Sequence, residues 1–273
     1  GLLAGLPNEV PGMTVNRFCS SGVQTISIAA ERIMSGAIDC AIAGGTESMS
    51  MIPMGGNNPS ANPRAMEELP EIYIGMGQTA ENVAERYDIS REQQDEFAAE
   101  SHQRAAEAWE RGFFEGEIAP METEVVDEDG NRTTETVERD ENVRPDTTKE
   151  ILAGLPPAFS EGGVVSPGNA SPLTDGAAAT VVMSKEKADE LGIEPLGYYR
   201  TMQVAGVPPD IMGIGPGPAV RKLLDATYED ELTPYAGLIY DLEVDEDNKV
   251  VGIITRFDIL NALEHLDERH HEY

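Results

Sequence analysis

The beginning of the chain alternates between helix-like and strand-like patterns. Residues 20–35 read as a helix that ends at Gly36, a residue suited to the left-handed conformation that follows many helices. Residues 37–43 form a short apolar run that stops at a pair of glycines, which is typical of a buried strand. Another apolar stretch precedes the helix. The order strand, helix, strand predicts an α/β fold in which Cys19 occupies a strand-to-helix turn.

Cys19 therefore stands where the predicted helix begins. A thiol in the first turn of a helix faces unsatisfied backbone N–H groups and the positive end of the helix dipole. Both favour the thiolate, which is the reactive form of the side chain. A lone cysteine is more often a buried structural thiol than a nucleophile, so the choice between these interpretations depends on the residues around it.

Length and composition narrow the class of protein. The 273 residues suffice for one large domain or two modest ones, and a hydrophobic content of 40% is ordinary for a soluble protein. No uninterrupted apolar segment is long enough to span a bilayer, and the apolar start lacks the basic leader of a signal peptide. The two cysteines, Cys19 and Cys40, do not indicate a disulfide framework, so we expect a cytoplasmic protein.

The charge balance is unusual. Acidic residues number 50 against 19 lysines and arginines, which gives a formal net charge of −31. Such a surface repels nucleic acids and anionic membranes, so neither is expected as a main partner. Two explanations stay open. One is adaptation to high salt, which screens the self-repulsion, and the other is an acidic protein of an ordinary environment.

Further elements are predicted along the rest of the chain. Residues 51–71 have no clear period, whereas residues 77–87 and 90–111 are helix-like, and Ser90 with Gln93 forms a capping-box start. The polar residues 122–150 read as an exposed hairpin or a partly mobile excursion. Later elements are a buried strand at 177–183, a helix at 184–191 with Ser184 as N-cap, a strand at 197–204, a loop at 208–217 and a helix at 218–227.

Four motifs, in order along residues 1–228, resemble segments of the thiolases, which transfer acyl groups to and from coenzyme A (CoA). They are Asn-Arg-Phe-Cys-Ser-Ser-Gly at 16–22, Gly-Gly-Thr-Glu-Ser-Met-Ser at 44–50, Tyr-Ile-Gly-Met-Gly-Gln-Thr-Ala-Glu-Asn-Val-Ala at 73–84 and Gly-Asn-Ala-Ser-Pro-Leu-Thr-Asp-Gly-Ala-Ala at 168–178. The first resembles the acyl-accepting motif of that family. It therefore favours the interpretation of Cys19 as a nucleophile.

The resemblance also implies an architecture, the layered α/β fold of the thiolases. The implied divisions are part of an N-terminal half (residues 1–50 and 172–195), a loop domain that covers CoA (51–171) and the start of a C-terminal half (196–228). A thiolase would have another strand–helix layer before Gly1, and the likeness stops near residue 228. The chain is thus expected to be truncated at both ends relative to that family.

The same resemblance implies a chemistry with CoA as a substrate and no metal or tightly bound cofactor. Cys19 would attack a thioester carbonyl and hold the acyl group, while its own N–H helps to stabilise the oxyanion. Ser171 would lie near the pantetheine arm of CoA, and Met76 near the acyl pocket. An ordinary turn serine and a packed methionine are the alternatives for these two residues. Asn16 and Arg17 are expected to shape the turn rather than to touch substrate.

The chain departs from the family in its acid–base groups. Thiolases use a histidine in a Gly-His-Pro motif, an Asn-Glu-Ala-Phe segment and a second cysteine in a Cys-x-Gly motif, and none of these is present. We interpret His102 as a surface histidine and Cys40 as an inert thiol in the middle of a buried strand. Cys19 can still react with a thioester, but turnover by this chain is not expected.

Residues 229–273 differ in composition and are predicted to form a small α+β module. Within it, residues 237–266 resemble the closing part of a CBS (cystathionine-β-synthase-type) domain. That resemblance implies that Thr255 and Asp258 hold the ribose and phosphate of an adenine nucleotide such as AMP or ATP. An ordinary hairpin followed by a helix explains the same residues equally well.

Three hypotheses follow. The first is an acyltransferase of the thiolase family, of the degradative 3-ketoacyl-CoA type, which acts on acyl-CoA and CoA and forms a homo-oligomer. The second is a non-catalytic module that senses adenine nucleotides through its CBS-like tail. The third is a fusion of two unrelated segments without a joint function.

Overall fold

A computed structural model describes residues 1–127 and 129–227 of the chain. These residues divide into two compact units. The first unit contains residues 1–61, 173–207 and 214–227, and the second contains residues 62–127, 129–172 and 208–213. The predicted CBS-like module at 229–273, with Thr255 and Asp258, lies outside the described residues.

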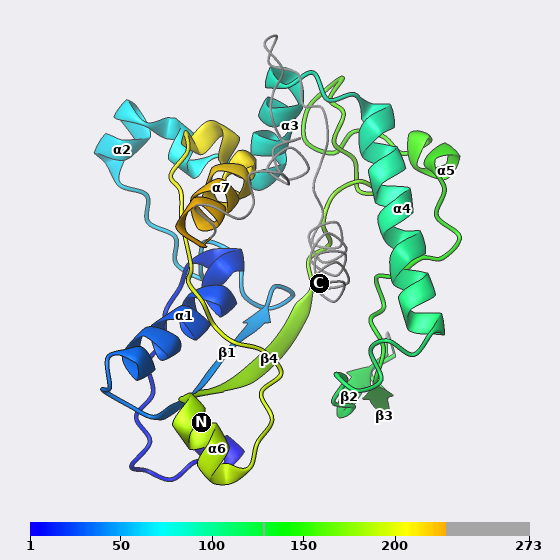
Figure 1. Cartoon of the computed structure of the whole chain (residues 1–273). Coiled ribbons are helices and arrows are strands. Elements are labelled where there is room, and N and C mark those ends of the chain that lie inside the picture. Colours follow the sequence, from blue (N-terminus) through cyan, green and yellow to red (C-terminus); the bar gives the residue numbers. More distant parts are fainter. Residues whose placement is uncertain (128, 228–273) are drawn as a thin grey trace, which may run out of the picture. The chain divides into compact units, whose positions relative to one another are not determined.

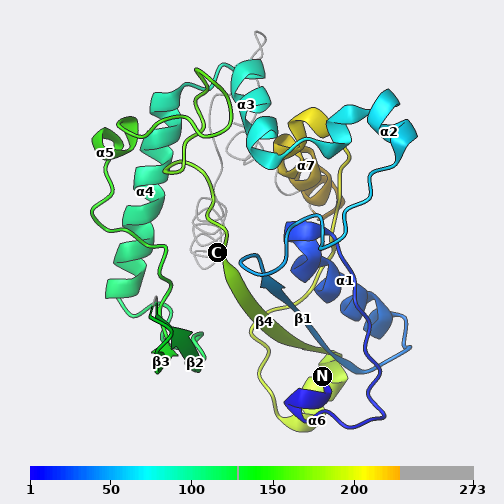
Figure 2. The ribbon, with the colours of Figure 1, turned by 180° about the vertical axis from the view of Figure 1, so that it is seen from behind.

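The first unit is built on one helix and two antiparallel strands. Helix α1 (Ser21–Met34) packs against strands β1 (Cys40–Ser48) and β4 (Asp175–Met183), as Figures 1 and 2 show from opposite sides. The buried positions of α1 are small residues, Ser27, Ala29 and Ala30, which let the helix approach the sheet closely. The predicted helix and its end are confirmed, and Gly36 adopts a positive φ of 71°.

The predicted strand at 37–43 is correct in kind but wrong in extent and burial. β1 runs from Cys40 to Ser48, so the two glycines lie inside the strand rather than at its end. Ala43 is the only residue of β1 that is buried. Cys40, expected in the middle of a buried strand, is the first residue of β1 and is exposed.

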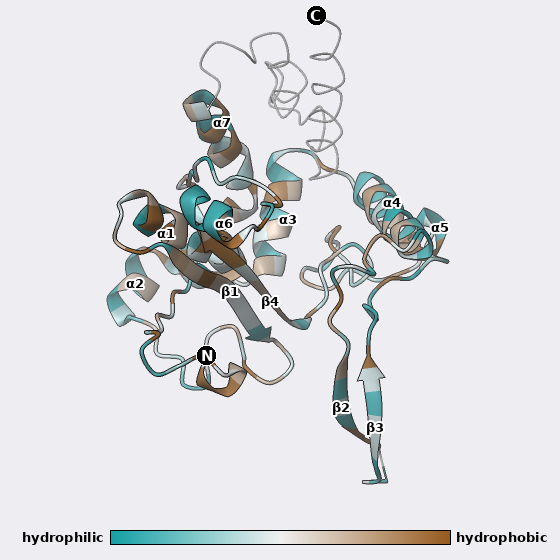
Figure 3. Cartoon of the chain, turned by 60° about the horizontal axis from the view of Figure 1, so that its bottom comes forward, coloured by the Kyte–Doolittle hydropathy of each residue, from teal (hydrophilic) through white to brown (hydrophobic). Residues whose placement is uncertain are grey.

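β4 begins close to the predicted residue 177, but it is not buried. Residues 175–181 of β4 are all exposed. The reason is that the sheet has two strands within the described residues, and α1 covers only one of its faces. Figure 3 shows brown, hydrophobic ribbon along part of each strand.

Two further strand predictions are wrong for the described structure. The apolar stretch before Cys19 and residues 197–204 contain no strand. A strand needs a neighbour that satisfies its backbone hydrogen bonds, and neither segment pairs with another described segment.

The remaining elements of the first unit are η1 (Leu2–Ala4), η2 (Phe18–Ser20), α6 (Lys185–Leu191) and α7 (Pro216–Thr227). Ser184 caps α6 as predicted, accepting a hydrogen bond from the Lys187 N–H at 3.1 Å.

The second unit is mainly helical. Its longest elements are α3 (Met76–Arg86), α4 (Arg91–Glu110) and the hairpin of β2 (Met121–Val126) and β3 (Arg132–Val137). α3, α4 and the Ser90–Gln93 capping box confirm the helices predicted at 77–87 and 90–111. The hairpin predicted as one alternative for residues 122–150 is present, and its strands end at Val137. The short elements α2 (Pro63–Glu68), η3 (Pro70–Tyr73), α5 (Lys149–Ala153) and η4 (Pro209–Ile214) were not predicted. Each is too short to show a period in the sequence.

The interior of the second unit combines small apolar residues with polar ones. The buried apolar residues are Ala84, Ala99, Ala106, Leu152, Val165 and Ile211. Five buried polar residues lie among them: Thr79, Glu81, Asp95, Thr147 and Ser166. Throughout the described chain, every buried side-chain nitrogen or oxygen has a hydrogen-bond partner. No helix in residues 1–127 or 129–227 is long and apolar enough to cross a membrane.

Candidate functional site

Cys19 lies in a sharp turn that leads directly into a helix. It is the central residue of η2, and α1 begins two residues later at Ser21. Its side chain is exposed. Phe18 has a φ of 46°, which is rare for a bulky residue and turns the backbone abruptly before the cysteine. The structure thus places the thiol at a helix start, where a substrate in solution can reach it.

Side chains of the surrounding motif fix this turn. The Phe18 N–H donates to Asn16 Oδ1 at 2.7 Å, and Arg17 Nε donates to Gln24 Oε1 at 2.9 Å. The Ser21 hydroxyl accepts from the Arg17 N–H at 2.8 Å and donates to the Phe18 carbonyl at 2.7 Å. Asn16 and Arg17 therefore shape the turn, as expected.

The N-terminal end of α1 is not capped by a side chain. Ser20 holds the N-cap position, but its hydroxyl donates to the Arg17 carbonyl at 2.9 Å and makes no capping hydrogen bond. The Ser21 N–H donates to the Phe18 carbonyl, but no side chain caps the amides that follow it, and the positive end of the α1 dipole lies beside Cys19. The sulfur in this position is exposed, so a reagent or substrate can approach it.

Two of the motifs that resemble thiolases meet in the β1–β4 sheet of the same unit. Asp175 accepts hydrogen bonds from the Ser50 hydroxyl, from the Ser50 N–H at 2.9 Å and from the Ser48 hydroxyl at 3.2 Å. These bonds, that of the Ser50 hydroxyl first, lower the pKa of Asp175 below its ordinary value of 3.8. The sequence did not predict this junction, although all three residues lie in the motifs at 44–50 and 168–178.

The two sheet strands also approach each other and α1 closely. The Thr25 hydroxyl of α1 donates to the Gly44 carbonyl of β1 at 3.2 Å. A Cβ atom at Gly44 would collide with the Ala178 carbonyl oxygen of β4, so only glycine fits there without a shift of the backbone. Glu47 is exposed and accepts from the Ser48 N–H at 3.1 Å.

Two other predicted site residues, Met76 and Ser171, lie in the second unit. Met76 is the first residue of α3, and its side chain is exposed. Ser171 is exposed too, in the segment between α5 and β4. His102, on α4, is half-buried, and its Nδ1 accepts from the Arg144 N–H at 3.2 Å. Residues 1–127 and 129–227 contain no group of three or more acidic, histidine or cysteine side chains that could hold a metal ion.

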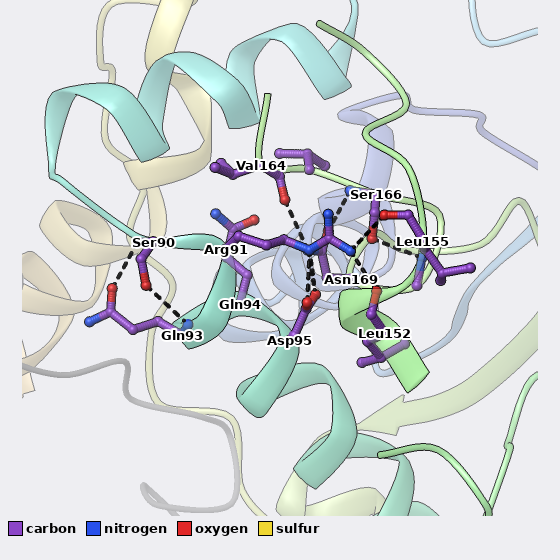
Figure 4. Close-up of polar contacts among 12 residues, drawn as sticks. Ser90, Arg91, Gln93, Gln94, Asp95, Leu152, Leu155, Val164, Ser166 and Asn169 are labelled. Atoms are coloured by element: carbon purple, nitrogen blue, oxygen red, sulfur yellow. Dashed lines mark hydrogen bonds and ion pairs between the residues drawn. The ribbon is translucent and has the colours of Figure 1, made fainter. Parts of the chain in front are cut away.

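A buried polar cluster in the second unit was not predicted. Arg91 Nε donates to both carboxylate oxygens of Asp95, at 2.9 and 2.8 Å, and Asn169 Nδ2 donates to Asp95 Oδ1 at 2.9 Å (Figure 4). The spacing of Arg91 and Asp95 by four residues is a sequence signal for the ion pair. Nothing in the sequence connects that pair to Asn169, which lies 74 residues further along the chain.

Comparisons with known proteins agree with the motifs. The family described as "Thiolase, N-terminal domain" matches residues 1–186. The 3-ketoacyl-CoA thiolase of Bacillus subtilis is 52% identical over 228 residues, which are 82% of this chain and 58% of that protein. The peroxisomal 3-ketoacyl-CoA thiolase A of Mus musculus is 48% identical over 223 residues, which are 81% of this chain and 53% of that protein.

Solved structures show the same likeness. The dimeric peroxisomal thiolase of Saccharomyces cerevisiae superposes with a TM-score of 0.75 at 38% identity, over 83% of this chain and 57% of that one. The acetyl-CoA acetyltransferase of Bacillus anthracis gives a TM-score of 0.69 at 43% identity, over 81% of this chain and 58% of that one. The chain spans little more than half the length of these proteins.

Proposed function

Because the chain belongs to the thiolase family, by its match to the N-terminal domain over residues 1–186, we propose that it accepts acyl groups from acyl-CoA on Cys19. The observation that carries the proposal is the exposed sulfur at the uncapped start of α1. Relatives named 3-ketoacyl-CoA thiolase favour a 3-ketoacyl-CoA as substrate, cleaved with CoA to acetyl-CoA and a shortened acyl-CoA.

The exposure of Cys19 in its turn supports the following covalent step. The Cys19 thiolate attacks the carbonyl carbon of the thioester, and the carbonyl oxygen becomes an oxyanion near the amides of the turn. When this intermediate collapses, the bond to the CoA sulfur breaks and CoA leaves as a thiolate. The acyl group then remains on Cys19 as a thioester, and a second CoA thiol can remove it in the reverse manner. With a 3-ketoacyl-CoA, the thiolate attacks the 3-keto carbon instead, and the bond between carbons 2 and 3 breaks. The acetyl-CoA fragment leaves as a carbanion that takes up a proton from solvent, and a CoA thiol then removes the shortened acyl group from Cys19.

Proton transfer limits what this chain achieves alone. The sequence contains no Gly-His-Pro motif, and His102, the only histidine in residues 1–227, accepts a backbone hydrogen bond in the second unit. A positioned general acid or base contributes about 10²–10⁴-fold to a rate. We therefore expect acylation of Cys19 without rapid turnover.

The two units have different tasks in this function. The first unit carries the nucleophile, and the second, with Met76 and Ser171, corresponds to the loop domain that covers CoA. The likeness to a thiolase described as dimeric supports a homo-oligomer. Large exposed apolar side chains on the first unit, such as Leu3, Ile42 and Leu196, also favour association. Light scattering on the purified chain tests this part of the proposal.

Mass spectrometry of the full chain after incubation with acetyl-CoA tests the covalent step. We expect one acetyl group, mapped to the peptide that contains Cys19. Cys19→Ala should remove the label, and Cys40→Ala is the matched control because Cys40 is the other exposed thiol. Absence of the acetyl group, or equal labelling of both cysteines, would contradict the proposal.

A further inference from the structure

The buried cluster of the second unit joins α4 to two distant segments. Asp95 is 1% exposed, and its carboxylate binds Arg91 of the same helix and Asn169. Arg91 Nη2 also donates to the carbonyls of Leu152 and Leu155, at 2.5 and 3.0 Å. Figure 4 shows the guanidinium group between the carboxylate and these two carbonyls. Arg91 thereby satisfies carbonyls at and after the end of α5 and fixes the orientation of Asp95.

The segment that contains Asn169 has neither a helix nor a strand to hold its backbone. Asn169 supplies the missing partners, because its Oδ1 accepts from the Ser166 N–H at 2.7 Å and its Nδ2 donates to the Val164 carbonyl at 3.1 Å. The hydroxyl of Ser166, which is fully buried, accepts from the Gly168 N–H at 3.3 Å. One asparagine side chain thus connects the buried carboxylate of Asp95 to both ends of a tight backbone turn.

A second buried carboxylate fixes the beginning of the same segment. Glu81 of α3, 8% exposed, accepts hydrogen bonds from the N–H groups of Val164 and Val165 at 2.9 and 3.0 Å. A Cβ atom at Gly163 would overlap the Glu81 carboxylate, and one at Gly168 would overlap the side chain of Leu152. The segment is therefore held to a single path by packing as well as by hydrogen bonds.

We propose that Asp95 is a positioning residue that acts through Asn169 to place residues 166–171 for CoA binding. The inference rests on the proposed function, in which Ser171, two residues after Asn169, lies along the pantetheine arm. A buried ion pair contributes little net stability compared with well-packed apolar residues. What the cluster supplies is a fixed loop conformation, since every buried polar side-chain atom in it is hydrogen-bonded and the loss of a partner in the interior is costly.

Two substitutions that change the net charge in opposite directions distinguish a positioning effect on CoA binding from an electrostatic one. Asp95→Asn removes a negative charge, whereas Asn169→Asp adds one opposite Asp95. If charge alone governed the binding of anionic CoA, Asp95→Asn would strengthen binding and Asn169→Asp would weaken it. Positioning predicts that both weaken it, by about tenfold, because each breaks a charge-assisted hydrogen bond to the turn. Asn57→Asp, at an exposed loop residue, is the control for the added charge and should bind CoA like wild type.

The experiment is calorimetric titration of the full chain with CoA, together with the rate at which iodoacetamide alkylates Cys19. We expect weaker CoA binding in both single variants, partial recovery in the Asp95→Asn/Asn169→Asp double variant and unchanged alkylation in all three. Ser166→Ala removes only the buried hydroxyl and should weaken CoA binding by a smaller factor. If the other variants do not fold, this variant provides the test.

Two results overturn the inference: wild type that does not bind CoA, and variants that fold and bind CoA as tightly as wild type. Variants that unfold at a lower temperature but bind CoA as tightly as wild type also overturn the inference, because the cluster is then purely structural. A chain that binds CoA but is not acetylated on Cys19 contradicts the acyl transfer instead, and it leaves the positioning result standing.

Discussion

The two units hold their chains together by different means. In the second unit, buried carboxylates bind an arginine, an asparagine and backbone amides, and these bonds fix a loop that has no regular structure. In the first unit, α1 rests on a two-stranded sheet through small side chains, and the polar junctions at Asp175 and around Cys19 are exposed. Burial makes the polar contacts of the second unit energetically important, whereas water screens those of the first.

The sheet of the first unit makes the contrast clearest. Ile42 and Val181 are opposite each other in the register and are 56% and 57% exposed. Ala43, the next residue along β1, is 3% exposed. One face of the sheet is therefore covered and the other is not, within the residues that the structure describes. In the second unit, the buried carboxylates are paired with residues of the same unit. The first unit instead presents an apolar sheet face that favours association.

The largest expected effect is on the second unit. Arg91→Met leaves the Asp95 carboxylate buried without its cation, which costs about 3–5 kcal/mol of unfolding free energy. Trp109, the only tryptophan, lies on α4, so its fluorescence during urea denaturation reports on this unit. Arg64→Met is the matched control, because the Arg64–Glu68 pair has the same spacing but side chains that are 81% and 54% exposed. The control should lose at most about 1 kcal/mol, and similar losses for the two variants would refute the contrast.

A smaller effect is expected where the strands of the first unit meet. Gly44→Ala forces a Cβ atom against the Ala178 carbonyl, so β1 and β4 must separate locally, at a cost of about 1–3 kcal/mol. Gly45→Ala is the control, since a Cβ atom there meets nothing within 4 Å. Hydrogen exchange of the β1 and β4 amides measures the difference. Equal protection in the two variants would show that the close approach at Gly44 does not limit the sheet.

How far the sequence predicts this molecule depends on how local each signal is. The ends of the helices were predicted correctly at Gly36, Ser90 and Ser184, where a cap and its partner lie within a few residues of each other. The strand predicted at 197–204 is absent, because a strand also depends on a neighbour that its own residues do not specify.

The candidate site follows the same rule. The position of Cys19 at a helix start could be predicted, since the helix and the turn are adjacent in the sequence. Asp175 could not be connected to Ser50, which is 125 residues away, nor Asp95 to Asn169. Such contacts depend on how the chain packs, and a single sequence contains no signal for them.

A still smaller effect is expected on the reactivity of Cys19. Ser21→Ala removes two hydrogen bonds of the turn, to the Arg17 N–H and the Phe18 carbonyl. The turn can then relax away from the start of α1, so alkylation of Cys19 by iodoacetamide should slow by about two- to tenfold. Ser35→Ala is the control, because that hydroxyl makes a similar local bond to the Arg32 carbonyl at the other end of α1. If both variants react like wild type, the hydroxyl of Ser21 has no part in shaping the site.

The smallest expected effect concerns acid and the exposed junction at Asp175. Hydrogen bonds from Ser50 and Ser48 lower the pKa of this carboxyl in the folded state below the ordinary value of 3.8 that it regains on unfolding. Its contribution to stability is therefore fully present above pH 3.8 and is lost as the pH falls through the lower, folded value. Asp175→Asn should show a smaller fall in the urea midpoint between pH 6 and pH 3 than wild type does.

Ser50→Ala keeps the carboxylate but removes its main donor, so its acid-induced fall should lie between those of wild type and Asp175→Asn. Ser35→Ala, far from the junction in sequence, should match wild type. Hydrogen exchange of the β1 and β4 amides at the two pH values locates the loss in the first unit. Identical falls for wild type and Asp175→Asn would mean that the junction adds nothing measurable, and the first unit would then depend on packing alone.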